Sequence, residues 1–145
     1  MSVHLLDVNV LIALLDPAHP NHEDAHSWYG PIRRSGWATC QLTIAGCVRV
    51  LSNPAYPSFD ATTPEVISHL RTFCAGRGHE FWPDGLSLVD GDLFRPDFIG
   101  GHQKVTDVLL LGLAVRHKGA LATFDRKIPI KAVIGAKPEH LRLLG

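Results

Sequence analysis

The sequence lacks the features that mark a secreted or membrane-spanning protein. Its three cysteines, Cys40, Cys47 and Cys74, are odd in number and have no CxxC spacing, which excludes a disulfide framework and a CxxC metal site. No apolar run approaches the roughly 18 residues that span a membrane. Residues 1–7 lack the basic stretch that opens a signal peptide. We therefore expect a reduced, cytoplasmic protein.

An excess of charge of either sign is also missing. The chain has 14 basic and 14 acidic residues, so its net charge gives no sign of a partner of opposite charge, and any nucleic-acid contact would depend on a local patch. The glycine pattern GxGxxG is absent too, which argues against a dinucleotide-binding oxidoreductase.

The residues present predict one globular α/β domain over residues 1–145. Hydrophobic residues make up 46% of the chain, and a chain of this length buries roughly 70% of its unfolded surface. Apolar strands are predicted at residues 3–6, 37–40, 121–124 and 132–134, and residues 141–144 read as a tail. Helices are predicted at residues 9–15, 21–29, 43–51, 63–76 and 104–118. This alternation favours a mainly parallel sheet.

Three aspartates occupy positions where a ligand site could form. Asp7 and Asp125 each follow an apolar strand, and ligands gather at that edge of open α/β sheets. Asp107 lies in the first turn of a strongly apolar helix, where an acid needs a partner. Each also has an ordinary explanation as a helix cap, a dipole partner or a turn residue. If the three converge, a divalent cation such as Mg²⁺ or Mn²⁺ relieves their repulsion, with Asn9 and Thr123 adding oxygen groups.

A second metal pattern matches in letters only. His22-Glu23-Asp24-Ala25-His26 fits HExxH, but a zinc site needs a third ligand, and none can be identified. Surface histidines are the preferred interpretation. A phosphate-receiving signalling domain is disfavoured as well, because such domains pair adjacent acids and Asp7 stands alone between Leu6 and Val8.

Four segments together resemble the PIN-domain family, and most of all the VapC-type toxins of bacterial toxin–antitoxin pairs. They are LLDVNVLIALL, CQLTIAGCVRVLSNPAY, KVTDVLLLGLA and LATFDRK, in the family's order and spacing. The resemblance implies a PIN-like α/β/α sandwich and a Mg²⁺- or Mn²⁺-dependent endoribonuclease, usually a homodimer, that a VapB-like antitoxin neutralises. It implies that the catalytic and metal-binding residues are Asp7, Asp107 and Asp125, with Asn9, Thr43 and Thr123 in support.

One position departs from the family pattern. The second acid usually follows the motif's threonine, and here that residue is Ile44. This departure raises an alternative, a catalytically weakened or silent binding protein with the same fold. It also predicts that Ile44→Glu would strengthen metal binding and RNA cleavage.

Contacts with RNA and with an antitoxin can be assigned only to candidate residues. Four basic residues are candidates for contacts with the phosphate backbone, namely Arg49, Lys104, Arg126 and Lys127, although a solvated surface charge is the preferred interpretation of any single one. For the antitoxin we expect an exposed apolar groove on residues 9–15 and 21–29. Its candidate residues are Leu14, Trp28 and Tyr29, which would otherwise complete the core.

Overall fold

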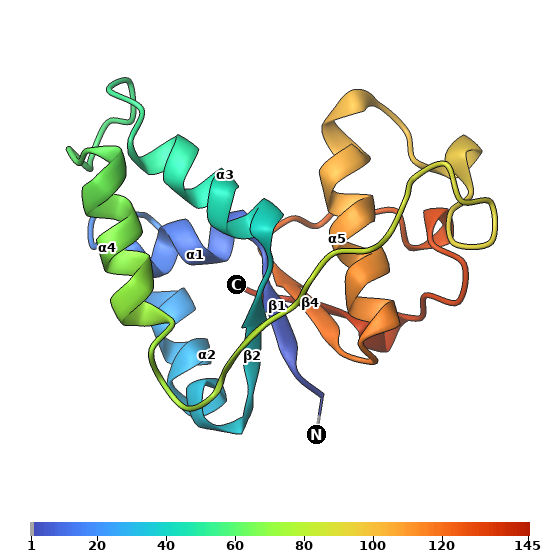
Figure 1. The fold of residues 1–145 in the computed structure, drawn as a ribbon, viewed down its shortest axis with the longest axis horizontal. Coiled ribbons are helices and arrows are strands. Elements are labelled where there is room, and N and C mark those ends of the chain that lie inside the picture. The colour runs from blue at the N-terminus through green and yellow to red at the C-terminus, as the bar shows by residue number, and fades with distance from the viewer. Residues whose placement is uncertain (1) are drawn as a thin grey trace.

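Five short strands form one parallel sheet in the computed structural model, which describes residues 2–145. The strand order is β3-β2-β1-β4-β5 (Figure 1). All four strand pairs are parallel, so the carboxyl ends of the strands share one edge. The strands are β1 (His4–Leu6), β2 (Trp37–Thr39), β3 (His79–Phe81), β4 (Ala120–Thr123) and β5 (Leu141–Leu143).

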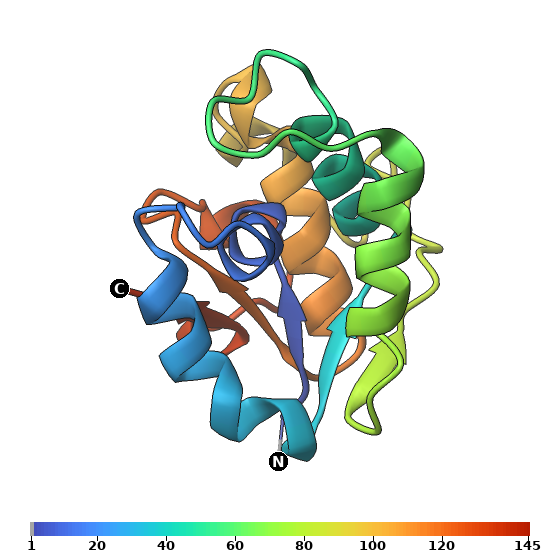
Figure 2. The same cartoon turned by 90° about the vertical axis from the view of Figure 1, so that its left-hand side faces the viewer.

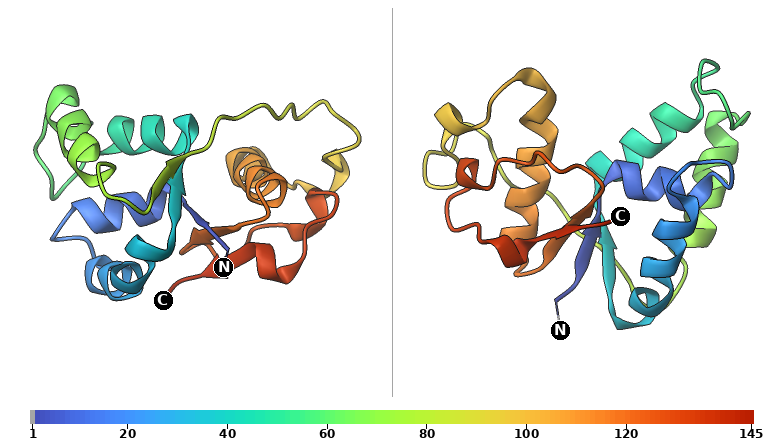
Figure 3. Two further views of the ribbon diagram at one scale, coloured as in Figure 1. Left: turned by 60° about the horizontal axis from the view of Figure 1, so that its bottom comes forward. Right: turned by 180° about the vertical axis from the view of Figure 1, so that it is seen from behind.

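Helices cover both faces of this sheet, as parallel strands require. The helices are α1 (Val8–Leu15), α2 (His22–Ser35), α3 (Gln41–Leu51), α4 (Thr63–Phe73) and α5 (Val105–Arg116). The first four lie on one face, and α5 with the short 3₁₀ turns lies on the other (Figures 1 and 3). Figure 2 looks onto the four-helix face, where α1 is seen nearly end-on between α2 and α4. The predicted α/β/α sandwich is confirmed.

Two hydrophobic clusters, one on each face of the sheet, hold the layers together. Successive residues of a strand point to opposite faces: Leu5 packs in the cluster around α5, and Leu6 packs in the cluster around α1. Trp37 and Ala38 divide between the faces in the same way. Each strand therefore contributes apolar side chains to both clusters.

The two edge strands were not predicted. In β3, Glu80 and Phe81 are exposed, so the strand has no buried apolar pattern to reveal it. Residues 141–143, expected to be a tail, form β5 beside β4. The strand predicted at residues 132–134 is wrong, because residues 130–132 form a 3₁₀ turn and only an isolated bridge joins Val133 to Phe94.

Helix α2 continues past residue 29, where the predicted helix ends just before Gly30 and Pro31. It runs to Ser35 and contains Pro31. A proline lacks one helical hydrogen bond, but Ile32 packs against the α1-side cluster and its carbonyl accepts the N–H of Gly36 at 3.1 Å. Tertiary packing therefore outweighs the local break.

The apolar groove expected for an antitoxin is not formed by the residues predicted for it. Leu14 is 4% exposed and Tyr29 is 7% exposed, and both belong to the core. Trp28 is half-buried, with its ring edge against His4. The expectation is wrong for Leu14 and Tyr29, because α1 and α2 turn these side chains inward.

Within residues 2–145, none of the helices combines the length and the apolar character needed to cross a membrane. The single domain predicted for residues 1–145 includes Met1, which lies outside the described residues, and it stays a prediction.

Candidate active site

Asp7 links the end of β1 to the start of α1. Its Oδ1 accepts the backbone N–H of Val8 at 2.7 Å, so it does cap the helix. Its Oδ2 accepts the hydroxyl of Thr123 at 2.7 Å, across 116 positions of sequence. The side chain is only 5% exposed. A simple cap needs no buried partner on a neighbouring strand, so helix capping does not account for all of this residue's contacts.

Thr123, at the end of β4, connects the polar groups of this edge. Besides donating to Asp7, its hydroxyl oxygen accepts the side-chain amide of Asn9 at 3.2 Å and the backbone N–H of Asp125 at 3.0 Å. The Oδ1 of Asn9 accepts the backbone N–H of Phe124 at 3.3 Å. These contacts hold the ends of two adjacent strands in one arrangement.

Asp125 lies just beyond β4 and is held in its ionised form. Its Oδ1 accepts the backbone N–H of Lys127 at 2.9 Å, and its Oδ2 pairs with the ammonium of Lys104 at 3.3 Å. The Lys127 N–H is the main cause that lowers the pKa of Asp125, with help from Asp107 and Lys104 against the cost of burial. The residue is therefore a stable negative charge near neutral pH.

Asp107, in the first turn of α5, has the opposite behaviour. Burial, the charge of Asp7 and hydrogen bonding with Asp125 raise its pKa to about 7, which Lys104 only partly opposes. Burial also raises the pKa of Asp7, and the charge of Asp125 adds to it. Asp107 therefore interacts with both other aspartates, and the ion pair of Lys104 with Asp125 at 3.3 Å places the start of α5 at the carboxyl edge of the sheet.

The chemistry of this cluster suits a hard divalent cation. A bound cation relieves the repulsion between neighbouring carboxylates, and oxygen ligands are those that Mg²⁺ and Mn²⁺ prefer. However, among residues 2–145 no three histidine, cysteine, aspartate or glutamate side chains are already arranged around one metal position. Because Lys104 pairs with one oxygen of Asp125, sharing a cation requires these side chains to rearrange.

Ile44 does not belong to this cluster. It lines a small apolar hollow with residues of α4 and β3, namely Ile67, Leu70, Arg71, Cys74 and His79. Gly46 is the α3 residue that faces the start of α1, since a Cβ there would lie 2.7 Å from Cγ2 of Val8. The expectation that position 44 stands among the acids is therefore wrong.

The remaining predicted site residues divide between structural and exposed positions. The hydroxyl of Thr43 donates to the carbonyl of Cys40 and accepts its N–H, both at 3.0 Å, so it caps α3. Arg126 donates to the carbonyl of Gly145 at 3.4 Å from the turn beside Asp125. Arg49 is exposed one helical turn after Gly46, and positions three apart share a helix face.

The two histidines of the HExxH match bind backbone carbonyls. Nδ1 of His22 lies 2.7 Å from the oxygen of Ala13, and Nε2 of His26 lies 3.0 Å from the oxygen of Leu14. A carbonyl only accepts, so each of these nitrogens carries a proton. Both rings thus satisfy the last carbonyls of α1, a role that explains their spacing of four.

The pairing of Lys104 with Asp125 is the part of the site that the sequence did not reveal. Lys104 was a candidate for RNA contact, but the structure pairs it with Asp125, in the only ion pair within residues 2–145. A separation of 21 residues between a lysine and an aspartate carries no signal, because only the meeting of α5 and β4 brings them together.

Comparisons with known proteins identify the family of this chain. The family model described as "PIN domain" matches residues 4–133. The chain belongs to the PIN domain family. It is 45% identical to "Ribonuclease VapC44" of Mycobacterium tuberculosis over 141 residues, 97% of this chain and 98% of that protein. It is 40% identical to "Ribonuclease VapC39" of the same species, over 90% and 94% of the two chains. "Ribonuclease VapC38" is 44% identical, over 83% and 84%.

Proposed function

We propose that this protein is a VapC-type toxin, an endoribonuclease that hydrolyses RNA phosphodiester bonds and is neutralised by a cognate VapB-like antitoxin. The observation that carries the proposal is the buried hydrogen bond from Thr123 to Asp7, which joins two strand ends beside Asp107 and Asp125. Relatives over nearly the whole chain are named as VapC ribonucleases. The proposal includes a cytoplasmic location and a homodimer.

The three aspartates would hold Mg²⁺ or Mn²⁺. When bound, such a cation lowers the pKa of a coordinated water and neutralises charge on the phosphate. Thr123 and Asn9 fix the orientation of Asp7, as groups behind a ligand do. Lys104 would turn from Asp125 towards substrate phosphate, and Arg49, Arg126 and Lys127 would contact the RNA backbone, which sets affinity rather than sequence choice.

The alternative is a catalytically weakened or silent binding protein with the same fold. It depended on Ile44 replacing an acid of the cluster, and Ile44 lies in the hollow against α4 instead. However, α3 contains no aspartate or glutamate, so the family's usual second acid is missing, and the cleavage assay separates an active enzyme from a silent one.

Cleavage of labelled RNA tests the proposal directly. We expect cleavage with MgCl₂ or MnCl₂, none in EDTA, and none by Asp7→Asn, whose side chain keeps the shape of the original. Asp60→Asn, at an exposed carboxylate before α4, is the matched control and should cleave normally. Cleavage by purified protein that persists in EDTA, or that persists in Asp7→Asn, would contradict the proposal.

A further inference from the structure

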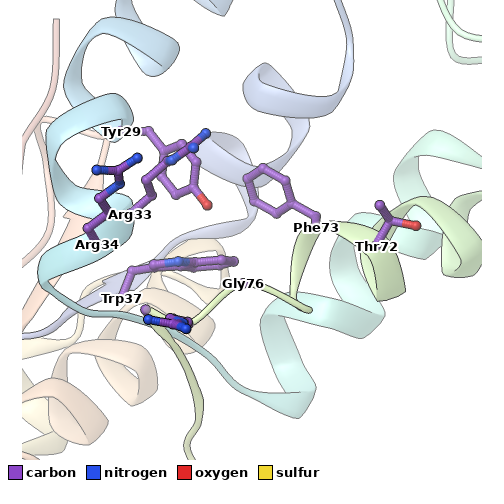
Figure 4. A pocket seen from close by; sticks show the side chains of 9 residues that line it. Tyr29, Arg33, Arg34, Trp37, Thr72, Phe73 and Gly76 are labelled. Atoms are coloured by element: carbon purple, nitrogen blue, oxygen red, sulfur yellow. The ribbon is translucent and has the colours of Figure 1, made fainter.

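A larger hollow opens at the edge of the sheet opposite the acids. It lies where α2 ends, β2 begins and α4 ends, and its volume is about 770 Å³. Its walls carry three aromatic residues, Tyr29, Trp37 and Phe73, and three arginines, Arg33, Arg34 and Arg77 (Figure 4). The proposed nuclease site uses none of these six side chains.

The three arginines give the hollow an uncompensated positive charge. Arg33 and Arg34 are exposed in the last turn of α2, and Arg77 is exposed in the turn before β3. The only ion pair within residues 2–145 is that of Lys104 with Asp125, so no carboxylate pairs with these three. Guanidinium groups bind phosphate through paired, charge-assisted hydrogen bonds.

The aromatic wall is a rigid apolar surface beside these charges. Tyr29 and Phe73 stack with ring centres 5.0 Å apart, and Trp37 packs its ring against both, at 5.3 and 5.1 Å. Trp37 is 1% exposed, whereas Phe73 is half-buried. Phe73 is therefore the ring that offers accessible surface, and the other two hold it in place.

The backbone fixes the two arginine-bearing segments relative to each other. A Cβ at Gly78 would overlap the carbonyl oxygen of Arg33, so only glycine allows the end of α2 to approach this turn. The N–H of Trp37 donates to the carbonyl of Gly78 at 2.9 Å. Arg33 and Arg77 therefore line one hollow from two segments whose backbones are in contact.

We propose that this hollow binds a phosphorylated nucleoside, with its phosphate on Arg33, Arg34 and Arg77 and its base against Phe73. The volume is in the range of sites for small organic ligands and far exceeds what a bare phosphate fills. Planar bases pack on aromatic rings while arginines take the phosphate. The choice of RNA as one source of the nucleotide rests on the proposed function; a free mononucleotide is the other source.

Titration in EDTA separates binding from cleavage. Calorimetry measures the binding of four probes. They are adenosine 5′-monophosphate, adenosine, inorganic phosphate and a 5′-phosphorylated single-stranded oligoribonucleotide. We expect the monophosphate to bind more tightly than adenosine or phosphate alone. Arg33→Gln combined with Arg77→Gln should weaken its binding roughly 10- to 100-fold, the loss expected for removing charged hydrogen bonds. Arg71→Gln, on the same helix as Phe73 but outside the hollow, should change nothing.

A second variant fills the hollow without removing charge. Gly76 lines it, and a Cβ there meets no atom within 4 Å, so Gly76→Leu should fold normally and block the base. Gly91→Leu, at another glycine with open space around it, is the control. We expect loss of monophosphate binding in Gly76→Leu alone, with unchanged thermal melting in both.

The outcomes distinguish this proposal from the proposed function. Weakened binding of the oligonucleotide as well as the monophosphate identifies RNA as a source, and an effect on the monophosphate alone identifies the free nucleotide. Monophosphate affinity that is unchanged in both the arginine pair and Gly76→Leu, or no better than that of inorganic phosphate, overturns the proposal. Metal-dependent RNA cleavage by the wild type is measured in a separate assay. Absence of cleavage would contradict the proposed nuclease function and leave the nucleotide-binding proposal untouched.

Discussion

Gly46 of α3 lies against Val8 of α1 so closely that a Cβ at position 46 would be 2.7 Å from Cγ2 of Val8. Val8 directly follows Asp7, so position 46 is where α3 approaches the acids. Ile44 lies two residues earlier, about 200° around the helix at 3.6 residues per turn. It therefore points to the opposite side of α3, towards α4.

This relationship reverses the expectation for Ile44→Glu. A glutamate at position 44 would enter an apolar hollow rather than the acidic cluster, so we expect it to lower the free energy of unfolding by about 1–2 kcal/mol. Neither the rise in melting temperature on adding Mn²⁺ nor RNA cleavage should increase. Thermal melts with and without Mn²⁺ measure the first, and the cleavage assay measures the second.

The neighbouring position supplies the control for that experiment. Ala45 is exposed, so Ala45→Glu adds the same charge to the same helix without burial and should leave stability within about 0.5 kcal/mol of wild type. A Mn²⁺-induced rise that grows in Ile44→Glu and not in Ala45→Glu would show that position 44 does reach the metal.

Thr123→Val should damage both stability and metal binding. Valine keeps the shape of threonine but removes the hydroxyl that serves Asp7, Asn9 and the N–H of Asp125. We expect a loss of about 1–3 kcal/mol in the free energy of unfolding, because buried polar partners are left unpaired. Mn²⁺ affinity, measured by calorimetry, should fall roughly 10- to 100-fold, as when a group that orients a ligand is removed.

Thr39→Val is the matched comparison for Thr123→Val. Thr39 is also buried at the end of a strand, and its hydroxyl lies 2.7 Å from Nε2 of His79. Loss of the Thr39 hydroxyl should lower the free energy of unfolding by an amount similar to that for Thr123→Val. The affinity for Mn²⁺ should stay unchanged. Equal losses of Mn²⁺ affinity in the two variants would mean that Thr123 acts only through the stability of the fold.

The ionisation of Asp16 should make the free energy of unfolding depend on pH. Burial raises its pKa, but hydrogen bonds from Ser58, Tyr56 and the N–H of Ala18 outweigh burial and lower it below the ordinary value of 3.8. A lowered pKa means that the folded state favours the ionised form, so the stabilisation is present above pH 3.8 and is lost as the pH falls through the folded-state pKa.

Denaturant titrations from pH 7 to pH 3 measure this effect. Wild type should exceed Asp16→Asn in free energy of unfolding near neutral pH, by about 1–3 kcal/mol for a hydrogen-bonded charge, and the difference should shrink below pH 4. Tyr56→Phe, which removes one donor at 2.7 Å from Asp16, should lose less at neutral pH. If the difference in free energy of unfolding between wild type and Asp16→Asn stays constant down to pH 3, the pKa of Asp16 is not lowered by folding and the prediction is wrong.

The sequence alone determined much of the architecture and part of the site. Apolar runs that end in Asp7 and Asp125 indicated two parallel strands with acids at one edge, and the long apolar stretch before Gly119 indicated a buried helix. These features are local: a strand or a helix core shows itself through the pattern of neighbouring residues. The family resemblance rested on the same segments, and the family match over residues 4–133 agrees with it.

Only the tertiary structure decided which groups meet. The edge strand β3 has exposed residues and no pattern, and it forms because β2 offers it hydrogen bonds. The pairing of Lys104 with Asp125 depends on where α5 begins relative to the end of β4. Which of Ile44 and Gly46 faces α1 depends on how α3 is rotated between α1 and α4. Such contacts join residues far apart in sequence, and no spacing along the chain encodes the distance between them.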